Sequence, residues 1–342
     1  MRYILSPIHI NQIFMAVVGL LCGGLFSGVV LADYSDYDDV KALINEMVEE
    51  HQFKRDELQL WFESAEKKQT ILDAIARPAE KSKAWKEYRK IFVTRSRTRK
   101  GLKFWQDNRD TLARAEREFS IPAEIIVAII GVETRYGQHM GNYRVIDALS
   151  TLAFDYEPRA VFFRKELKAF LLLTKEQKQD PLTLKGSYAG AMGYGQFMPS
   201  SFRAYAVDFD DDGIADIWNN PVDAIGSVAN YFKRHGWRYG ERVVTRARIA
   251  ADYNRDRVNL GLKPNIEYAN LQRQGYDAVE HITATTEVLP MRFEGIHGAE
   301  FWLGLHNFYV ITRYNRSRMY SLSVHQLSQA IKADYDALKR QL

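Results

Sequence analysis

Thiol groups are almost absent from this chain. Cys22 is the only cysteine among its 342 residues, and it lies in an apolar N-terminal run. A chain with one thiol forms no internal disulfide, and removal of the run would leave no thiol, hence no thiolate metal site and no cysteine nucleophile. The fold must therefore be held together by burial of apolar side chains, for which a chain of this length is ample.

Two signatures of common hydrolases are also missing. No His-Glu-x-x-His pair occurs among the eight histidines, which disfavours a zinc peptidase. No Gly-x-Ser-x-Gly sequence occurs, which disfavours a serine hydrolase. A strong excess of one charge is lacking too: the net charge of +4 would help at an anionic cell wall but identifies no partner.

The N-terminus has the pattern of a secretory signal. Arg2 is followed by an uncharged apolar run over residues 13–32, and a polar chain begins at Asp33. This order predicts a signal peptide over residues 1–32, export and a periplasmic location. The run is nearly long enough to span a bilayer, so an uncleaved anchor is the main alternative and would be the only membrane contact. Nucleic acid is a poor partner for an exported chain, and we expect none.

One stretch concentrates basic side chains: Arg95, Arg97, Arg99, Lys100 and Lys103. Charge runs of this kind are usually the solvated face of a helix or loop. We therefore interpret the stretch as such a face and assign it no function.

Apolar spacing divides the chain into segments. Residues such as Val40, Leu43 and Met47 recur at helical spacing, whereas β-branched and aromatic runs between polar breaks follow Arg242. The predicted fold class is mainly α (α+β), with one small β-containing subdomain. The expected segments are a signal peptide (1–32), an N-terminal helical region (33–118), a central core (119–241), a small β-containing subdomain (242–300) and a C-terminal helical segment that packs on the core (301–342).

Glu133 is the first candidate for a catalytic group. A helix is expected to begin near Ser120-Ile121-Pro122, with Ser120 as its cap and Pro122 in its first turn, and to stop at Gly137. Glu133 then falls on the same stripe as Ile129 and Ile130. A carboxylate partly removed from water shifts toward its neutral form, which is what a general acid requires. From the helix alone, an ordinary helix-end residue paired with Arg135 remains the simpler interpretation.

A glycine-rich segment follows at 186–196. It lacks the ending of a phosphate loop and the spacing of a dinucleotide fingerprint. Glycines in such a segment let backbone approach a bulky substrate closely. Hydrogen-bonding side chains (Ser187, Gln196) beside apolar ones (Tyr188, Tyr194, Phe197, Met198) form the mixture expected of a sugar-binding groove. A tight structural loop is the alternative.

Three separated motifs resemble those of the membrane-bound lytic murein transglycosylase B family. They are Gly131-Val132-Glu133-Thr134-Arg135-Tyr136-Gly137, the segment 187–201, and the segment 223–232 that begins Asp-Ala-Ile-Gly-Ser. They occur in the family's order, and the likeness extends over nearly the whole chain after residue 32. Chance does not explain three motifs of this length.

The resemblance implies a lysozyme-like catalytic core over 119–241, in which Glu133 is the single catalytic acid. It implies that Ser187 and Gln196 orient the N-acetylated sugars. The positions that match the lining of the groove are Tyr88, Phe197, Met198, Tyr231 and Tyr309. The substrate implied is the peptidoglycan glycan strand, and other cell-wall enzymes are candidate partners.

The implied reaction breaks the bond between N-acetylmuramic acid and N-acetylglucosamine and leaves a 1,6-anhydro ring. Ordinary glycosidases flank this kind of bond with two carboxylates. Here the muramyl 6-hydroxyl is the nucleophile, so one carboxyl group can act first as acid and then as base. Holding that hydroxyl against the anomeric carbon contributes up to roughly 7–11 kcal/mol through proximity.

An acidic loop follows the glycine-rich segment. Asp208, Asp210 and Asp212 stand at positions 1, 3 and 5 of a calcium-type loop, with glycine at position 6. Position 12 is Asn219, and the resembled family closes its loop at the residue matching Asp223. We therefore expect structural calcium, no organic cofactor, and these ligands: Asp208, Asp210, Asp212, the Ile214 carbonyl and Asp223, with Asp216 as a water-mediated contributor. A solvated acidic turn is the alternative.

Two other functions remain open at this point. A lysozyme-type hydrolase would use the same acid with an ordered water opposite Glu133. A non-catalytic wall-binding module would be expected to lose the acid, and this chain keeps it.

Overall fold

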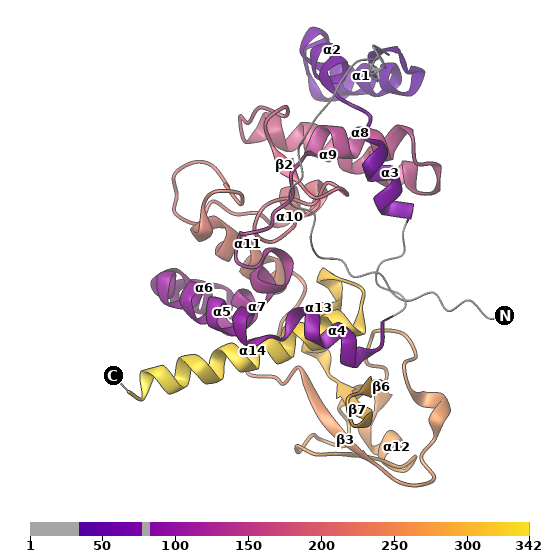
Figure 1. Cartoon of the computed structure of the whole chain (residues 1–342), viewed down its shortest axis with the longest axis vertical. Coiled ribbons are helices and arrows are strands. Elements are labelled where there is room, and N and C mark those ends of the chain that lie inside the picture. Colours follow the sequence, from indigo (N-terminus) through magenta and orange to yellow (C-terminus); the bar gives the residue numbers. More distant parts are fainter. Residues whose placement is uncertain (1–33, 77–82, 342) are drawn as a thin grey trace, which may run out of the picture. The chain divides into compact units, whose positions relative to one another are not determined.

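Helices form most of the described chain, which comprises residues 34–76 and 83–341 of the computed structural model (Figure 1). The N-terminal helices are α1 (Asp38–His51), α2 (Arg55–Ser64), α3 (Gln69–Ala76), α4 (Trp85–Phe92), α5 (Arg95–Asp107) and α6 (Arg109–Phe119). The central helices are α7 (Ala123–Thr134), α8 (Val145–Phe154), α9 (Ala160–Glu176), α10 (Pro199–Tyr205) and α11 (Pro221–Arg234). Three short 3-10 helices are η1 (Tyr34–Asp36), η2 (Glu157–Arg159) and η3 (Arg255–Arg257). The mainly α prediction is confirmed, and the predicted signal peptide lies outside the described residues.

The strand-rich part is a five-stranded antiparallel sheet with the order β4-β6-β7-β3-β5. Its elements are β3 (Val244–Ile249), β4 (Ile266–Glu267), α12 (Tyr268–Gln272), β5 (Tyr276–Ala278), β6 (Glu287–Gly295) and β7 (Gly298–Gly304). A second, two-stranded sheet pairs β1 (Tyr143–Arg144) with β2 (Lys185–Gly186). The predicted small β-containing part is thus present, although β7 runs through residue 300, where the sequence placed a segment boundary.

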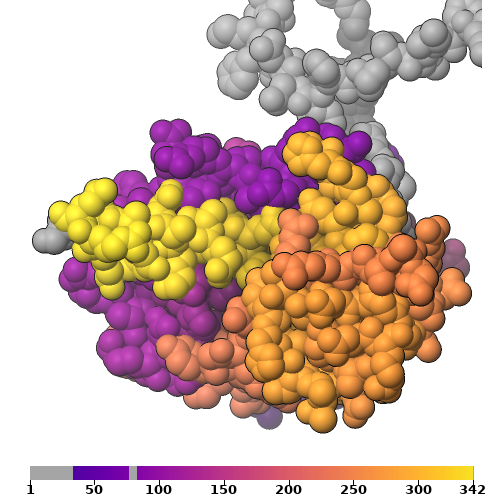
Figure 2. Space-filling view, turned by 90° about the horizontal axis from the view of Figure 1, so that it is seen from below, coloured from indigo at the N-terminus to yellow at the C-terminus, as the bar shows by residue number. Residues whose placement is uncertain are grey.

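The C-terminal helices are α13 (His306–Tyr314) and α14 (Arg318–Lys339). Ser317 caps helix α14, because its side chain accepts a hydrogen bond from the Tyr320 N–H group at 3.2 Å. It packs against α4, α5, α7 and α13. Residues of α14 and of the β6–β7 hairpin line one cavity, and Figure 2 shows the helix beside the sheet on one face.

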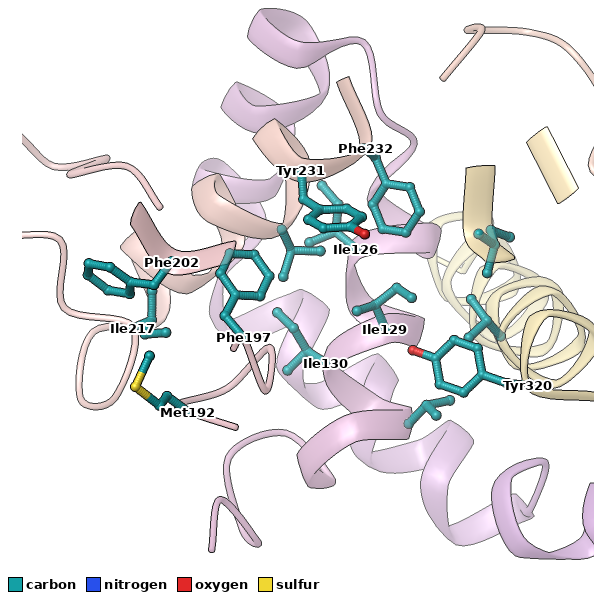
Figure 3. Packing of buried hydrophobic residues seen from close by; sticks show 14 of the residues in the cluster. Ile126, Ile129, Ile130, Met192, Phe197, Phe202, Ile217, Tyr231, Phe232 and Tyr320 are labelled. Atoms are coloured by element: carbon teal, nitrogen blue, oxygen red, sulfur yellow. The ribbon is translucent and has the colours of Figure 1, made fainter. Parts of the chain in front are cut away.

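Helix α7 lies at the centre of this packing. It contacts α5, α6, α11 and α14, and all of its residues from Ala123 to Val132 except Glu124 are buried (Figure 3). The prediction of one apolar stripe was therefore too narrow, because the helix is enclosed on every side. Its start near Pro122 agrees with the prediction, but the predicted cap was wrong: Ser120 ends α6 in a left-handed conformation with φ 58°, and Pro122 occupies the N-cap position instead of the first turn.

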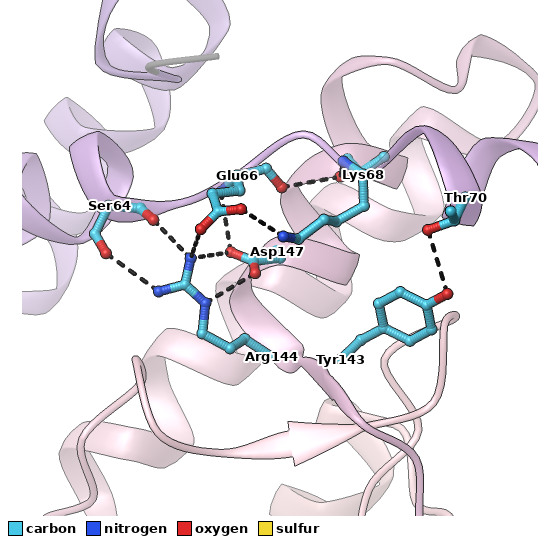
Figure 4. A network of polar contacts seen from close by, with 8 residues as sticks. Ser64, Glu66, Lys68, Thr70, Tyr143, Arg144 and Asp147 are labelled. Carbon is cyan, nitrogen blue, oxygen red and sulfur yellow. Dashed lines mark hydrogen bonds and ion pairs between the residues drawn. The ribbon is translucent and has the colours of Figure 1, made fainter. Parts of the chain in front are cut away.

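The end of α2 is tied to α8 by a polar network around Arg144 (Figure 4). The Arg144 guanidinium donates to both carboxylate oxygens of Asp147 at 2.8 Å and to the Ser64 carbonyl oxygen at 2.7 Å. Asp147 is 2% exposed and also accepts from the Glu66 N–H group at 3.0 Å. A buried bidentate pair of this kind fixes geometry, so it joins the N-terminal helices to the core.

Candidate active site

Glu133 lies in the last turn of α7 and is half-buried. The hydroxyl of Tyr320 donates a hydrogen bond to its Oε1 at 2.5 Å. Tyr320 comes from α14, and Figure 3 shows its hydroxyl directed toward α7. The carboxyl group is therefore oriented by a residue far away in the sequence.

Two tyrosine hydroxyls near Glu133 are held in their neutral form. Burial, followed by the negative charge of Glu133, raises the pKa of Tyr320 well above its ordinary value. The same two causes raise the pKa of Tyr314, whose enclosed hydroxyl donates to the Gly195 carbonyl oxygen at 2.5 Å. Both groups are therefore hydrogen-bond donors at neutral pH. The half-buried carboxyl of Glu133 thus lies near two fixed hydroxyl dipoles.

An aromatic cluster surrounds Tyr314. Its ring centroid lies 4.7 Å from that of Tyr231 and 6.0 Å from that of Phe197. Phe197 and Tyr231 are 3% and 7% exposed, and the Tyr231 hydroxyl donates to the Arg313 carbonyl oxygen at 2.7 Å. The structure thus packs these two predicted lining residues into the core beneath the site rather than on its surface.

The glycine-rich segment holds both predicted hydrogen-bonding residues in defined orientations. The Ser187 Oγ accepts from the N–H groups of Ala189 and Ala191 at 3.3 and 3.0 Å, so its own hydrogen can be donated outward. The side-chain amide of Gln196 donates to the carbonyl oxygens of Met140 and Gly193 at 3.1 and 3.0 Å. Those two bonds use both amide hydrogens and leave the side-chain oxygen as the group that can accept from a ligand.

At least one glycine of this segment serves the protein's own packing. A Cβ on Gly195 would lie 2.8 Å from the Tyr314 hydroxyl. The glycines were predicted to let substrate approach the backbone closely. At Gly195 the missing side chain instead makes room for the Tyr314 hydroxyl.

The remaining predicted lining residues do not all line the same cavity. Tyr88 lines a cavity of about 970 Å³ together with Trp85, Tyr188 and Arg318, close in sequence to Tyr320. Tyr309 lines another cavity, of about 700 Å³, whose described lining contains no other predicted active-site residue. Met198 is half-buried beside Phe197.

Two residues at this site were missed by sequence reasoning, Tyr314 and Tyr320. Neither belongs to the three motifs, and nothing in their local spacing distinguishes them from Tyr309. The only signal that separates them is the packing of α13 and α14, because it decides which tyrosine of a helical run faces α7.

The acidic loop brings three carboxylates together. Asp208, Asp210 and Asp212 can each place one oxygen within 4.8 Å of the others. Calcium binds oxygens at about 2.3–2.6 Å, so ligands on opposite sides of one ion lie up to about 5 Å apart. The donor set therefore fits a hard cation of that size. Backbone N–H groups also shape the loop, since Asp208 accepts from the Asp212 and Gly213 N–H groups at 3.1 and 2.7 Å.

Asp223 takes a different position from these three. It is fully buried, and its two oxygens accept from the N–H groups of Phe209 and Asp216 at 2.6 and 2.8 Å. Burial raises its pKa to about 6, and the nearby charges of Asp210 and Asp208 add to that increase. Among the described residues, the group that could share one ion contains the three loop carboxylates but not Asp223. Ile214 is exposed at the loop's edge, where its N–H donates to Asp212 Oδ1 at 2.9 Å.

The chain resembles known proteins over almost all of this structure. Residues 35–329 match the family model described as the transglycosylase SLT domain. The chain is 42% identical over 308 residues to membrane-bound lytic murein transglycosylase B of Escherichia coli strain K12, covering 87% of this chain and 84% of that protein.

Solved structures give the same result. Lytic transglycosylase SltB1 of Pseudomonas aeruginosa is 53% identical with a TM-score of 0.86, covering 89% of this chain and all of that one. The E. coli lytic transglycosylase Slt35 in complex with calcium is 42% identical with a TM-score of 0.82, covering 89% and 95%. SltB3 of P. aeruginosa in complex with NAG-NAM-pentapeptide is 28% identical with a TM-score of 0.78, covering 86% and 79%.

A mainly helical, lysozyme-like fold is shared with solved lytic transglycosylases, a class of glycan-cleaving enzymes. The chain belongs to the transglycosylase SLT domain family, and it is a lytic murein transglycosylase that cleaves peptidoglycan. The predicted family, fold class and enzymatic function are confirmed. Over residues 34–76 and 83–341, no helix has both the length and the apolar character needed to cross a bilayer.

Proposed function

We propose that Glu133 is the single catalytic acid and base of the transglycosylase reaction. The observation that carries this proposal is the hydrogen bond from Tyr320 to Glu133 Oε1, made by a hydroxyl that burial keeps protonated. A carboxyl group oriented by a fixed donor, at the end of an enclosed helix, supports a role as general acid and base.

In the proposed reaction, the proton of Glu133 passes to the oxygen of the glycosidic bond, and the bond from that oxygen to the muramyl anomeric carbon breaks. The muramyl 6-hydroxyl oxygen bonds to the same carbon and returns its proton to the Glu133 carboxylate. The acid is thus regenerated, and no water is consumed. Exclusion of water favours the sugar hydroxyl, and the apolar packing of Phe197, Tyr231 and Tyr314 supports that condition.

Ser187 and Gln196 are proposed to orient the N-acetylated sugars. The Gln196 oxygen, held by two bonds from its own amide, is suited to accept the N–H of an acetamido group. The Ser187 hydroxyl is suited to donate to a sugar or acetamido oxygen. Tyr88, Met198 and Tyr309 are proposed as lining residues, and Phe197 and Tyr231 as the packed layer that supports them.

Product masses test this mechanism. Purified residues 33–342 are incubated with peptidoglycan, and the muropeptides are separated by liquid chromatography and weighed by mass spectrometry. The expected products are lighter by one water than hydrolytic ones and carry 1,6-anhydromuramic ends. Products with reducing ends would show that water, not the 6-hydroxyl, is the nucleophile.

The acidic loop is proposed to bind one calcium ion through Asp208, Asp210, Asp212 and the Ile214 carbonyl, with Asp223 as the buried residue that closes the loop. The support is the convergence of three carboxylates and the calcium complex of the E. coli relative. The ion would neutralise mutual repulsion and act as a structural clamp. Calorimetric titration with CaCl₂ measures the affinity, and the absence of saturable heat in the folded protein would refute the site.

Export is proposed because residues 1–32 have the pattern of a secretory signal. The division of the remaining chain into a helical region, a core, a β-containing subdomain and a C-terminal segment is proposed as given above. Peptidoglycan strands are the proposed partner, since the relative SltB3 is solved with a NAG-NAM-pentapeptide. Cell fractionation with an antibody against the chain tests the location. Recovery with cytoplasmic markers would contradict it.

A further inference from the structure

A small cavity lies at the N-terminus of α5, outside the predicted site. Its volume is about 60 Å³, and its lining consists of Thr94, Ser96, Arg97, Lys100 and Arg135. A cavity of this size has room for a small polyatomic group. Three of the five lining residues are cations, the other two carry hydroxyls, and no carboxylate belongs to the described lining.

The charge at this helix end is opposite to what helices prefer. The N-terminus of an α-helix carries partial positive charge and favours acidic side chains. The first turn of α5 contains no acidic residue, and Arg95 and Arg97 lie in it instead. Thr94 caps the helix by accepting from the Arg97 N–H group at 3.1 Å, which leaves other first-turn N–H groups directed outward. An anion would be stabilised by both the helix end and the side chains.

Arg97 supplies the independent observation. Arg97 is only 6% exposed, and its Nη1 atom is buried without a hydrogen-bond partner among the described residues. The Phe92 ring, 5.1 Å from its guanidinium carbon, offers some stabilisation. Burial, and then the charge of Arg135, lower the pKa of Arg97. The basic stretch is therefore not a uniformly solvated face, as the sequence suggested, because one of its members is buried at a cavity.

We propose that this cavity is a binding site for a tetrahedral oxyanion of the phosphate class, held by Arg97, Lys100, Arg135 and the hydroxyls of Thr94 and Ser96. A dianion matches three cations better than a single carboxylate does, and a phosphate group matches the volume. The ligand is free inorganic phosphate or the phosphate of a lipid headgroup. The proposal does not depend on the role assigned to Glu133.

The site is mechanically connected to the turn that follows Glu133. Arg135 and Tyr136 both have left-handed backbone conformations, with φ 51° and 63°. The Tyr136 hydroxyl donates to the Arg97 carbonyl oxygen at 2.9 Å. An anion that bridges Arg97 and Arg135 would therefore hold this turn against α5 from a second side.

Thermal unfolding of residues 33–342 in sodium phosphate, compared with sodium chloride at equal ionic strength, tests the site. Phosphate is expected to raise the Tm saturably, by about 2–4 °C once its concentration exceeds the Kd tenfold. The measured quantity is the phosphate-dependent increment, so a variant with altered intrinsic stability remains informative. Arg97→Gln and Lys100→Gln should each weaken the apparent phosphate affinity at least about tenfold. Lys100 is exposed, so its variant folds even if removal of Arg97 disturbs the core.

Arg99→Gln is the matched control, because Arg99 lies on the same helix, is exposed and does not line the cavity. It should keep the full increment. An increment equal in phosphate and chloride, or undiminished in both Arg97→Gln and Lys100→Gln, would overturn the proposal. Co-sedimentation with phosphatidylglycerol vesicles but not phosphatidylcholine vesicles, lost in Arg97→Gln, would assign the lipid headgroup; a phosphate increment without vesicle binding would assign the free ion.

Discussion

The surroundings of Glu133 and the acidic loop both position carboxylates, but by opposite means. Glu133 lies on an enclosed helix and is oriented by Tyr320, 187 residues away. The loop carboxylates are exposed or half-buried, and Asp208 and Asp212 bond to N–H groups within a few residues. The first arrangement depends on tertiary packing, whereas the second is encoded by local sequence.

Because of this difference, the two regions should respond differently to substitutions and to movements of distant helices. A local loop keeps its shape when a distant helix moves, and under the proposed calcium site its carboxylates would respond mainly to the cation. The Glu133 site loses its donor when α14 shifts, even though the motif around the acid is unchanged. Substitutions should therefore affect catalysis in the first region and cation-dependent stability in the second.

Glu133→Gln should have the largest effect. The amide keeps the size of the side chain but removes the transferable proton, so kcat should fall by roughly 10³-fold or more. Release of anhydro-muropeptides, followed by mass spectrometry, measures the loss. Glu124→Gln, in the first turn of the same helix, is the control and should retain activity. Wild-type product from Glu133→Gln would remove this residue from the mechanism.

Tyr320→Phe should have the next largest effect. It deletes only the donor to Glu133, and a hydrogen bond to a charged group contributes about 1.5–3 kcal/mol, equivalent to roughly a 10–100-fold loss of kcat. Steady-state kinetics on purified glycan strands measure it. Tyr335→Phe is the control, since Tyr335 lies on the same helix but stacks on Trp105 at 4.2 Å. An unchanged kcat in Tyr320→Phe would mean that the acid is positioned by its own helix.

Asp210→Asn should act on stability rather than rate. In wild type, calcium at a hundredfold excess over its Kd should raise the Tm by about 4–6 °C. The variant should lose most of that increase while its kcat at 25 °C stays within about threefold of wild type. Asp211→Asn, an exposed neighbour outside the three-carboxylate group, should respond like wild type. Equal loss in both variants would indicate a diffuse charge effect.

The smallest expected effect is a loss of stability at acidic pH, caused by His325 on α14. Burial lowers the pKa of His325 to about 4. Below about pH 6.5, His325 is protonated in the unfolded state but stays neutral in the folded state. The free energy of unfolding therefore falls as the pH drops from 6.5 toward 4. At pH 5 the loss is about 2 kcal/mol. Urea unfolding at pH 7 and pH 5 should show a smaller difference for His325→Gln, whereas His281→Gln, on an exposed residue, should match wild type.

The sequence predicted most of what is local. The helical character, the position of Glu133 and the spacing of Asp208, Asp210 and Asp212 follow from periodicity and loop chemistry, both readable over a few residues. Ser120 was misassigned because a serine can cap the start of one helix or end the previous one, and only the backbone distinguishes them.

The features that could not be predicted from the sequence are contacts between segments far apart in the chain. Tyr320 meets Glu133 only because α14 packs on α7, and the spacing of tyrosines between 309 and 320 does not reveal which ones turn inward. Arg97 looks like its exposed neighbours in a basic run, and only its 6% exposure distinguishes it. The first fact depends on a partner 187 residues distant, and the second on tertiary packing around α5.

The 187-residue separation between Glu133 and Tyr320 also affects when the two residues can meet during protein synthesis. At a synthesis rate of about 5–20 residues per second, the ribosome completes Tyr320 roughly 10–40 s after Glu133. Throughout that interval the nascent chain contains Glu133 without the hydroxyl that orients it. The C-terminal helix is synthesised last, so this hydrogen bond forms only when the rest of the chain already exists.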